Sequence, residues 1–199
     1  MKVLGITGPT GSGKSLVSDF LKEKGIPCID ADAVYHKLLI PPSECLDAIR
    51  TAFGDEVLAP DGSLDRTRLA AIVFTDADKL ELLNTTVLDR VLDKIRLIIS
   101  DYAQKGYTTV VVDAPTLIES GFDKECGTVL SVLAPAKKRL QRIMERDGLT
   151  EQKATERVKA QKSDAYYIEH SDYVIINDES AEKLKNTLFS ILDTLDMSH

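Results

Sequence analysis

The chain has 199 residues, of which 43% are hydrophobic and 29% are charged. This length and balance suit one globular domain, or a core with a modest insert, and exclude a mainly disordered chain. The formal net charge of −7 argues against a dedicated nucleic-acid or membrane-surface binder, because such proteins need a basic face. We therefore expect small-molecule partners, with no nucleic acid and no membrane.

The cysteines point to a reducing compartment. Cys28, Cys45 and Cys126 are odd in number and far apart, and they form neither a CxxC motif nor a Cys/His cluster, which is typical of free thiols. The N-terminal apolar run is too short for a signal peptide, and no stretch approaches the ~18 residues of a membrane helix. We expect a cytoplasmic protein. It would be a monomer or a weak homo-oligomer, since the apolar helices of the middle segment could form either core or interface.

Short apolar runs rich in β-branched residues alternate with longer runs of helical spacing. This alternation predicts an α/β fold with a five-stranded parallel sheet and right-handed crossovers. The expected strands are Val3–Thr7, Ile26–Ile29, Thr109–Val112, Thr128–Leu133 and Tyr173–Ile176. The expected helices are Lys14–Lys24, Ala33–Leu39, Leu46–Phe53, Arg66–Phe74, Ala77–Ala103, Ala136–Arg146, Glu151–Gln161 and Ala181–Leu195.

The first strand runs into the segment Gly8–Ser15, which fits G-x-x-x-x-G-K-[ST] and is followed by an amphipathic helix. Glycines let the backbone N–H groups of such a loop turn towards phosphate, and the helix presents its positive end to the same anion. Lys14 can then reach the β- and γ-phosphates, while the Ser15 hydroxyl can ligate Mg²⁺. We name Gly8–Ser15 the phosphate loop, and it predicts a nucleoside triphosphate site.

The class of nucleotide-binding protein is indicated by what accompanies the phosphate loop. The sequence contains no Asn-Lys-x-Asp segment, which reads guanine in GTPase switches, and no Leu-Ser-Gly-Gly-Gln signature of transport ATPases. A small-molecule kinase needs an acceptor pocket, a base near the acceptor hydroxyl and mobile arginines over the transferred phosphate. The chain offers candidates for all three.

Carboxylates follow the second and third strands, where ligand chemistry collects in open α/β sheets. Asp30 is best explained as the N-cap of the next helix. For Asp32, helix capping and acceptance of a proton from the acceptor hydroxyl are equally open. Asp113 ends the third strand as expected for an acid that holds the Mg²⁺ shell, directly or through water, and the alternative is a solvated strand end.

About seventy residues of mainly helical pattern separate the second and third strands, which is too much for a single crossover. We interpret residues 34–107 as a helical insert, with a turn at Asp61-Gly62. Residues 1–33 and 108–199 would form the core of a single domain that comprises residues 1–199.

Residues 136–162 are basic within an acidic chain, with nine Lys and Arg side chains against four carboxylates. Arg139, Arg142 and Arg146 recur at spacings of three and four, which places them on one helix face. Two helices joined at Asp147-Gly148 would form a lid that brings guanidiniums onto a transferring phosphate. The alternative is a solvated charged face. We name residues 136–162 the lid.

In this order the motifs resemble the dephospho-coenzyme A kinase family over nearly the whole chain. The matching segments are Gly5–Gly8, Gly11–Ser15, Ile29–Asp32 with His36 and Leu38, Phe53-Gly54, Asp61–Arg66, Asp113–Glu119, Arg142, Arg146, Arg157, Gln161 and Val174–Asn177. The resemblance implies a P-loop three-layer fold in which the helical insert binds the acceptor and the lid covers the phosphates.

The resemblance also implies an activity, which is transfer of the ATP γ-phosphate to the ribose 3′-hydroxyl of dephospho-coenzyme A with Mg²⁺. The implied catalytic residues are Asp32 as the base, Lys14 and Arg142. The implied ATP-binding residues are Gly8, Thr10, Gly11, Ser12, Gly13, Lys14, Ser15, Leu16, Arg142, Arg146 and Asn177. The implied acceptor-binding residues are Asp32, His36, Asp113, Pro115, Leu117, Arg157 and Gln161, and the implied metal-binding residues are Ser15 and Asp113.

Two other functions stay open, namely a different nucleoside or nucleotide kinase and a nucleotide-binding regulatory protein without transfer activity. Leu88-Asp89 stands where the family usually has His-Pro, and Thr116 replaces a leucine of the acceptor-side segment. Both departures concern acceptor contacts. The enzyme is favoured by the presence together of Lys14, Asp32, Arg142 and Arg146.

Overall fold

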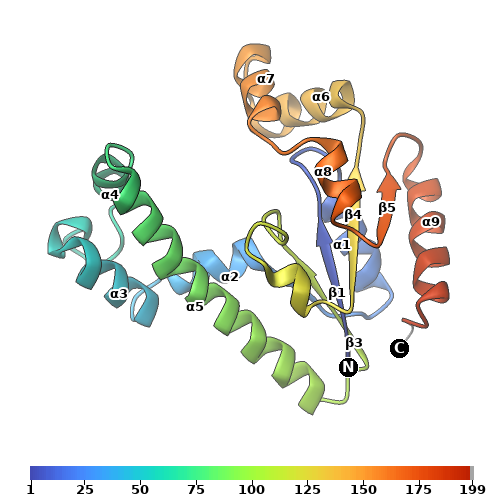
Figure 1. Cartoon of the computed structure of the whole chain (residues 1–199), viewed down its shortest axis with the longest axis horizontal. Coiled ribbons are helices and arrows are strands. Elements are labelled where there is room, and N and C mark those ends of the chain that lie inside the picture. The colour runs from blue at the N-terminus through green and yellow to red at the C-terminus, as the bar shows by residue number, and fades with distance from the viewer. Residues whose placement is uncertain (198–199) are drawn as a thin grey trace. The chain divides into compact units, whose positions relative to one another are not determined.

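In the computed structural model, which describes residues 1–197, five strands form one sheet. The strands are β1 (Lys2–Thr7), β2 (Cys28–Asp30), β3 (Thr109–Asp113), β4 (Thr128–Leu133) and β5 (Tyr173–Ile176). Their spatial order is β2-β3-β1-β4-β5, and β1 pairs in parallel with both β3 and β4. The predicted five-stranded parallel sheet is thus confirmed (Figure 1).

The chain divides into two compact units. The first comprises Met1–Ile29 and Asp101–His199, and the second comprises Asp30–Ser100. The sequence places the helical insert at residues 34–107, whereas the second unit runs from Asp30 to Ser100.

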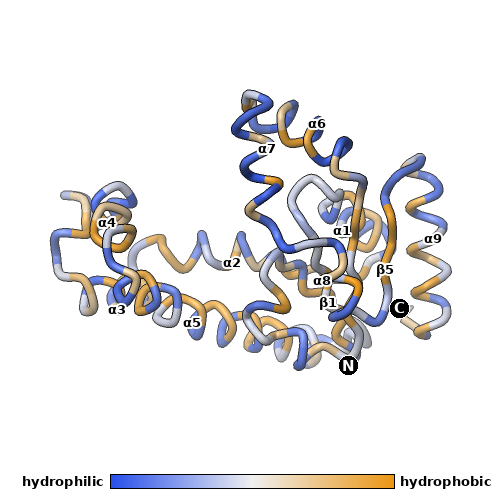
Figure 2. Tube along the Cα trace, turned by 45° about the horizontal axis from the view of Figure 1, so that its top comes forward, coloured by the Kyte–Doolittle hydropathy of each residue, from blue (hydrophilic) through white to orange (hydrophobic). Residues whose placement is uncertain are grey.

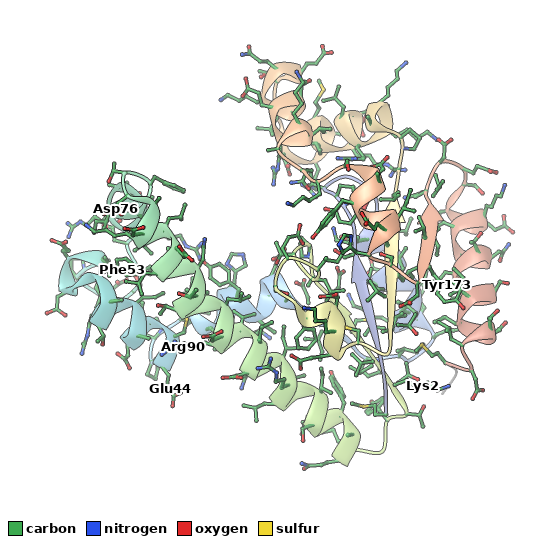
Figure 3. The ribbon with its side chains drawn as sticks, viewed as in Figure 1. Lys2, Glu44, Phe53, Asp76, Arg90 and Tyr173 are labelled. Carbon is green, nitrogen blue, oxygen red and sulfur yellow. The ribbon has the colours of Figure 1, made fainter. Side chains whose placement is uncertain are left out.

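Besides the sheet, the first unit contains α1 (Lys14–Glu23), α6 (Ala136–Asp147), α7 (Glu151–Lys159), α8 (Asp164–Glu169) and α9 (Ala181–Thr194), with a 3-10 helix η2 at Phe122–Glu125. Helices α1, α8 and α9 contact strands of the sheet. Every residue of β4 is buried, which explains its uninterrupted apolar pattern, since a central parallel strand is covered on both faces. Figure 1 shows α9 running beside β5. At the other end of the chain, Lys2 Nζ donates to the backbone oxygens of Leu195 and Asp196, at 2.8 and 2.7 Å (Figure 3).

The register of the sheet brings the site residues to one edge. Ile6 of β1 lies opposite Asp113 of β3 and opposite Leu130 of β4. The phosphate loop therefore leaves the sheet next to the end of β3. The carboxyl ends of parallel strands share one edge, which is where open α/β sheets bind ligands.

The second unit is helical. It contains α2 (Ala31–Leu38), α3 (Glu44–Phe53), a 3-10 helix η1 (Asp55–Val57), α4 (Arg66–Val73) and most of α5 (Ala77–Gln104). Ser43 and Asp65 cap α3 and α4 by accepting backbone N–H groups, as expected for these residue types. Ile49, Phe53 and Val73 are in its buried core, and Figure 2 shows hydrophilic and hydrophobic residues alternating along α5. A turn forms at Asp61-Gly62, as the sequence predicts.

The predicted elements are confirmed to within two residues at their ends. The second strand begins at Cys28 rather than Ile26, because Pro27 has no N–H to donate and the Ile26 N–H closes α1 on Leu21. Helix α8 was not predicted, since Asp164–Glu169 is too short to show a helical period. Among the described residues, no helix combines the length and apolar character that a membrane span requires.

Candidate nucleotide and phosphoryl-transfer site

The phosphate loop passes very close to its neighbours, and two glycines make this possible. Gly11 and Gly13 have φ of +78° and +100°, which is backbone geometry that glycine adopts at little cost. A Cβ on Gly11 would lie 2.8 Å from the backbone oxygen of Arg139, and one on Gly13 would overlap the side-chain amide of Asn177. The loop therefore needs glycine here for both conformation and space.

Some side chains of the phosphate loop are buried and others are exposed to solvent. Lys14 Nζ donates to the Gly8 carbonyl at 2.8 Å, so the ammonium group spans the loop. The Ser12 hydroxyl is buried without a hydrogen-bond partner among the described residues, while Ser15 is exposed on the first turn of α1. Leu16 packs against the core of the first unit. No described side chain caps the start of α1, which suits a helix N-terminus that receives an anion.

Two of the predicted nucleotide residues hold the loop by its carbonyl groups. Arg142 donates from one guanidinium nitrogen to the carbonyls of Gly11 and Ser12, at 3.1 and 3.2 Å. The Asn177 side-chain amide donates to the Ser12 carbonyl at 2.8 Å, and Asn177 is buried. Satisfying these carbonyls from outside fixes the orientation of their peptide groups. Arg142 and Asn177 are thus brought to the phosphate loop, and their contact with nucleotide stays a prediction.

Side chains of the lid form hydrogen bonds with both polar backbone groups of Thr10. Its N–H donates to Gln161 Oε1 at 3.0 Å, and its carbonyl accepts from Arg139 Nε at 3.3 Å. Arg139 is only 4% exposed, and its guanidinium also lies 3.3 Å from the Asp164 carboxylate. Gln161 thus contacts the loop backbone, and its assignment to acceptor binding stays a prediction.

The burial of Arg139 was not predicted from the sequence. The spacing of Arg139, Arg142 and Arg146 predicts one helix face, but the three side chains have different partners. The available signal was the spacing of four between Arg139 and Ile143, which is also buried in α6.

The end of β3 holds an acid, as predicted. The Asp113 carboxylate accepts a hydrogen bond from the Ser18 hydroxyl of α1 at 2.6 Å. Beyond it, the Pro115 carbonyl accepts from the Thr7 hydroxyl at 3.2 Å. Leu117, assigned to acceptor binding, is fully buried and would meet any Cβ placed on Gly5 at 2.6 Å. The Leu117 side chain is therefore part of the core, and its assignment to acceptor binding stays a prediction.

The tip of the lid carries a pair of arginines on one carboxylate. Gly148 adopts the left-handed conformation between α6 and α7. Asp147 accepts from Arg146 Nε at 2.7 Å and from Arg157 at 2.7 Å. The hydrogen bond from Arg146, and then the charges of Arg146 and Arg157, hold the pKa of Asp147 below its ordinary value. Arg146 is exposed, unlike Arg139.

The remaining predicted residues lie in the second unit. Asp30 caps α2 by accepting the Ala33 N–H at 3.0 Å, which confirms the capping interpretation. Asp32 is exposed on the first turn of α2. The His36 ring lies 3.3 Å from the guanidinium of Arg66. The roles of Asp32 and His36 towards an acceptor stay predictions.

The oxygen donors near the phosphate loop fit a magnesium ion that is shared with phosphates. The Ser15 hydroxyl and the Asp113 carboxylate are hard donors of the type that Mg²⁺ takes. Within residues 1–197, no group of three or more His, Cys, Asp or Glu side chains could hold a metal by itself. A Mg²⁺ bound here would therefore take most of its ligands from nucleotide phosphates and water.

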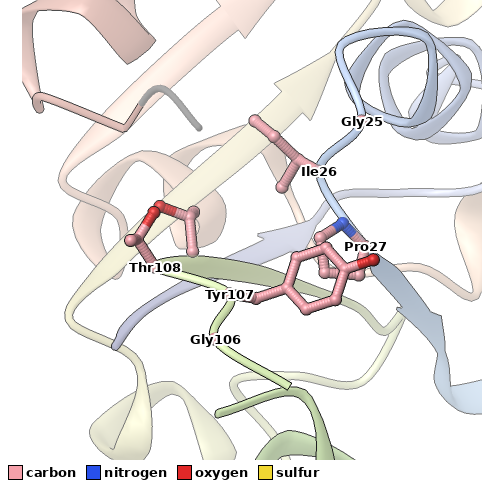
Figure 4. A pocket seen from close by; sticks show the side chains of 7 residues that line it. Gly25, Ile26, Pro27, Gly106, Tyr107 and Thr108 are labelled. Carbon is pink, nitrogen blue, oxygen red and sulfur yellow. The ribbon is translucent and has the colours of Figure 1, made fainter. Parts of the chain in front are cut away.

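A separate cavity of about 230 Å³ lies away from this site, at the amino end of β3 (Figure 4). It is lined by Gly25, Ile26, Pro27, Gly106, Tyr107, Thr108 and Thr109. The lining contains no charged side chain that could bind an ionic substrate.

A parallel sheet with a phosphate loop after its first strand, an acid at the end of β3 and an arginine-rich helical lid define a P-loop kinase. The family model for dephospho-CoA kinase matches residues 2–183, which include the phosphate loop, the helical insert and the lid. The chain therefore belongs to the dephospho-CoA kinase family.

Individual relatives agree with this membership. A dephospho-CoA kinase from Shouchella clausii is 38% identical, over 96% of this chain and 96% of its own length. The crystal structure of TT1252 from Thermus thermophilus is 30% identical, with a TM-score of 0.80 over 98% of this chain and 97% of its own. A dephospho-CoA kinase structure from Campylobacter jejuni has a TM-score of 0.72 at 24% identity, covers 98% of both chains, and supports the fold.

Proposed function

We propose that this chain transfers the γ-phosphate of ATP to the ribose 3′-hydroxyl of dephospho-CoA, giving CoA and ADP as the last step of CoA biosynthesis. The observation that supports this most directly is the family match over residues 2–183. That range contains Lys14, Asp32, Asp113 and Arg142, so each residue that the chemistry requires falls within it.

The nucleotide side of the reaction uses the phosphate loop. Its N–H groups and the start of α1 bind the phosphates, and the Lys14 ammonium group moves from the Gly8 carbonyl to the β- and γ-phosphates. Arg142 and Arg146 add positive charge from the lid. Mg²⁺ held near Ser15 and Asp113 would neutralise charge on the phosphate oxygens.

The acceptor side needs a proton acceptor and contacts that hold the ribose. As the 3′-oxygen bonds to phosphorus and the bond to the ADP oxygen breaks, the hydroxyl proton passes to the Asp32 carboxylate. The acceptor contacts would come from His36, Asp113, Pro115 and Arg157. Because the transition state is loose, positioning and charge should contribute more to the rate than the base.

The activity is tested by measuring ADP release with ATP and Mg²⁺, with and without dephospho-CoA, with AMP and adenosine as competing acceptors. We expect strong ADP release only with dephospho-CoA, and CoA as the product. Preference for AMP or adenosine would instead identify another nucleotide or nucleoside kinase and direct attention to Leu88-Asp89 and Thr116. ATP binding without transfer to any acceptor would favour a regulatory nucleotide-binding protein.

The role of Asp32 is tested with Asp32→Asn against Asp30→Asn. Because the transition state is loose, we expect loss of the base to lower kcat by about 10²-fold, the low end for general-base catalysis, while ATP affinity should stay unchanged. Asp30→Asn removes a neighbouring charge but retains a good N-cap residue, so this variant should keep its turnover. Near-normal turnover of Asp32→Asn would contradict the assignment of Asp32 as the base.

A further inference from the structure

Asp147 joins two arginines that come from different helices of the lid. It is the last residue of α6. Its Oδ1 accepts from Arg146 Nε at 2.7 Å, and its Oδ2 accepts from another Arg146 nitrogen at 2.9 Å and from Arg157 at 2.7 Å. Both carboxylate oxygens are therefore engaged, and one of them is shared between α6 and α7, which Figure 1 shows following each other at the tip of the lid.

Helix energetics alone do not explain an aspartate at this position. The C-terminal end of a helix is the negative end of its dipole, so basic residues are favoured there and acids are disfavoured. The following Gly148 already supplies the left-handed residue that ends α6. The contact of Asp147 with Arg146 and Arg157 offsets this unfavourable interaction with the helix dipole, and the same contact lowers the pKa of Asp147.

The contact also leaves both arginines able to bind anions. A guanidinium carries five N–H donors in a fixed plane. Arg146 donates two of these N–H groups to Asp147, and Arg157 donates one. Each guanidinium can thus bind phosphate oxygens while Asp147 fixes the orientation of its plane, which is how a carboxylate partner prepares a bidentate arginine.

We propose that Asp147 is a positioning residue that holds Arg146 and Arg157 as one unit and so couples the binding of ATP to the binding of the acceptor. This inference rests on the proposed function, in which Arg146 serves the ATP phosphates and Arg157 serves the acceptor. Asp147 is not a catalytic residue, because it acts through the two arginines and not on the substrates.

The test compares Asp147→Asn with Glu145→Gln in the full chain. Glu145 is two residues earlier in α6, is exposed and contacts Gln141 within the same helix, so its variant loses the same charge without disturbing the arginines. Steady-state rates are measured while ATP and dephospho-CoA are varied in turn, and ATP affinity is measured by titration with and without the acceptor.

For Asp147→Asn we expect kcat/KM to fall about tenfold for both substrates, because a charged hydrogen bond is lost. We also expect the coupling to disappear, so that the acceptor no longer raises the affinity for ATP. Asp147→Glu should recover part of this loss, since it restores the carboxylate. Glu145→Gln should stay within about twofold of wild type. Arg146→Lys should raise mainly the KM for ATP, and its effect should not add to that of Asp147→Asn, because residues in one network are not independent.

Three results would overturn the inference. The first is an Asp147→Asn variant that matches Glu145→Gln, and the second is one with lower thermal stability but unchanged kinetics and ATP affinity. The third is faster turnover or tighter ATP binding in Asp147→Asn, because the carboxylate would then be restraining the arginines. Failure of the proposed function would look different, since the wild-type protein would not phosphorylate dephospho-CoA, and the ATP titration would still test Asp147.

Discussion

Replacing Gly11 by alanine tests whether the phosphate loop depends on its close packing against α6. Gly11 has a φ of +78°, and a Cβ placed there would lie 2.8 Å from the backbone oxygen of Arg139 and 3.0 Å from its Cα. Alanine in left-handed backbone geometry costs about 1–2 kcal/mol. Because the neighbouring atoms are backbone, the loop and α6 must separate, which adds about 1–3 kcal/mol of overpacking. The expected loss of unfolding free energy is therefore about 2–5 kcal/mol.

Gly106→Ala is the matched control. Gly106 has a φ of +86°, and a Cβ there would meet no heavy atom within 4 Å beyond its adjacent residues. It should therefore lose only the backbone contribution, about 1–2 kcal/mol. The difference between the two variants isolates the contact between the loop and Arg139.

Urea unfolding of both variants gives the two free energies, and an ATP titration gives the functional effect. A displacement of about 1 Å in a binding loop can cost about 100-fold, so Gly11→Ala should weaken ATP binding markedly, while Gly106→Ala should bind as wild type. Equal losses of stability in the two variants, with equal ATP affinities, would refute the reasoning from close packing.

Three further predictions concern Lys14, Asn177 and the half-buried thiols of Cys28 and Cys126. Lys14→Met should lower kcat about 10²–10³-fold, as expected for one lost electrostatic contact to the transition state, and steady-state rates that barely change would exclude this role. Asn177→Ala should lower the unfolding free energy by about 0.5–1.5 kcal/mol, because the Ser12 carbonyl loses one of its two donors and keeps Arg142, and urea unfolding measures this. Burial raises the pKa of Cys28 and of Cys126 from 9.0 to about 12, so the unfolded chain loses these protons first and the unfolding free energy should fall as pH rises from about 9 towards 12. A double Cys→Ala variant should lose less stability over that range, and an identical pH dependence would contradict the assignment.

Most of the fold could be predicted because the apolar pattern agrees with the positions of the Gly, Pro, Asp and Asn residues that follow the strands. The inner strands β3 and β4 are buried along almost their whole length, so they form short apolar runs rich in β-branched residues. In the insert, α3 combines amphipathic spacing with the capping residue Ser43. The start of β2 was misplaced because the apolar character of Ile26 and Pro27 outweighed the missing N–H of proline. Helix α8 gave no periodic signal, although Ser163 caps it by accepting the Tyr166 N–H.

The phosphate loop could be predicted because its chemistry is local in sequence, whereas the side chains that hold it come from afar. Arg139 contacts Thr10 across 129 positions, and Asn177 contacts Ser12 across 165. Charge and spacing placed the arginines of α6 on a single face, but they could not show which of them is buried. Burial depends on the packing of α6 against the loop, and that packing is determined by the tertiary fold.

The contacts between the loop and the lid restrict how the lid can close. Arg139, Arg142 and Gln161 together make four hydrogen bonds to the backbone of Thr10, Gly11 and Ser12. Moving the whole lid would break all four, at about 0.5–1.5 kcal/mol each. A movement confined to the residues between Arg142 and Gln161 would break none of them. If the lid closes over the phosphates as proposed, we therefore expect the movement to involve its tip alone, and the tip is where Asp147 joins α6 to α7.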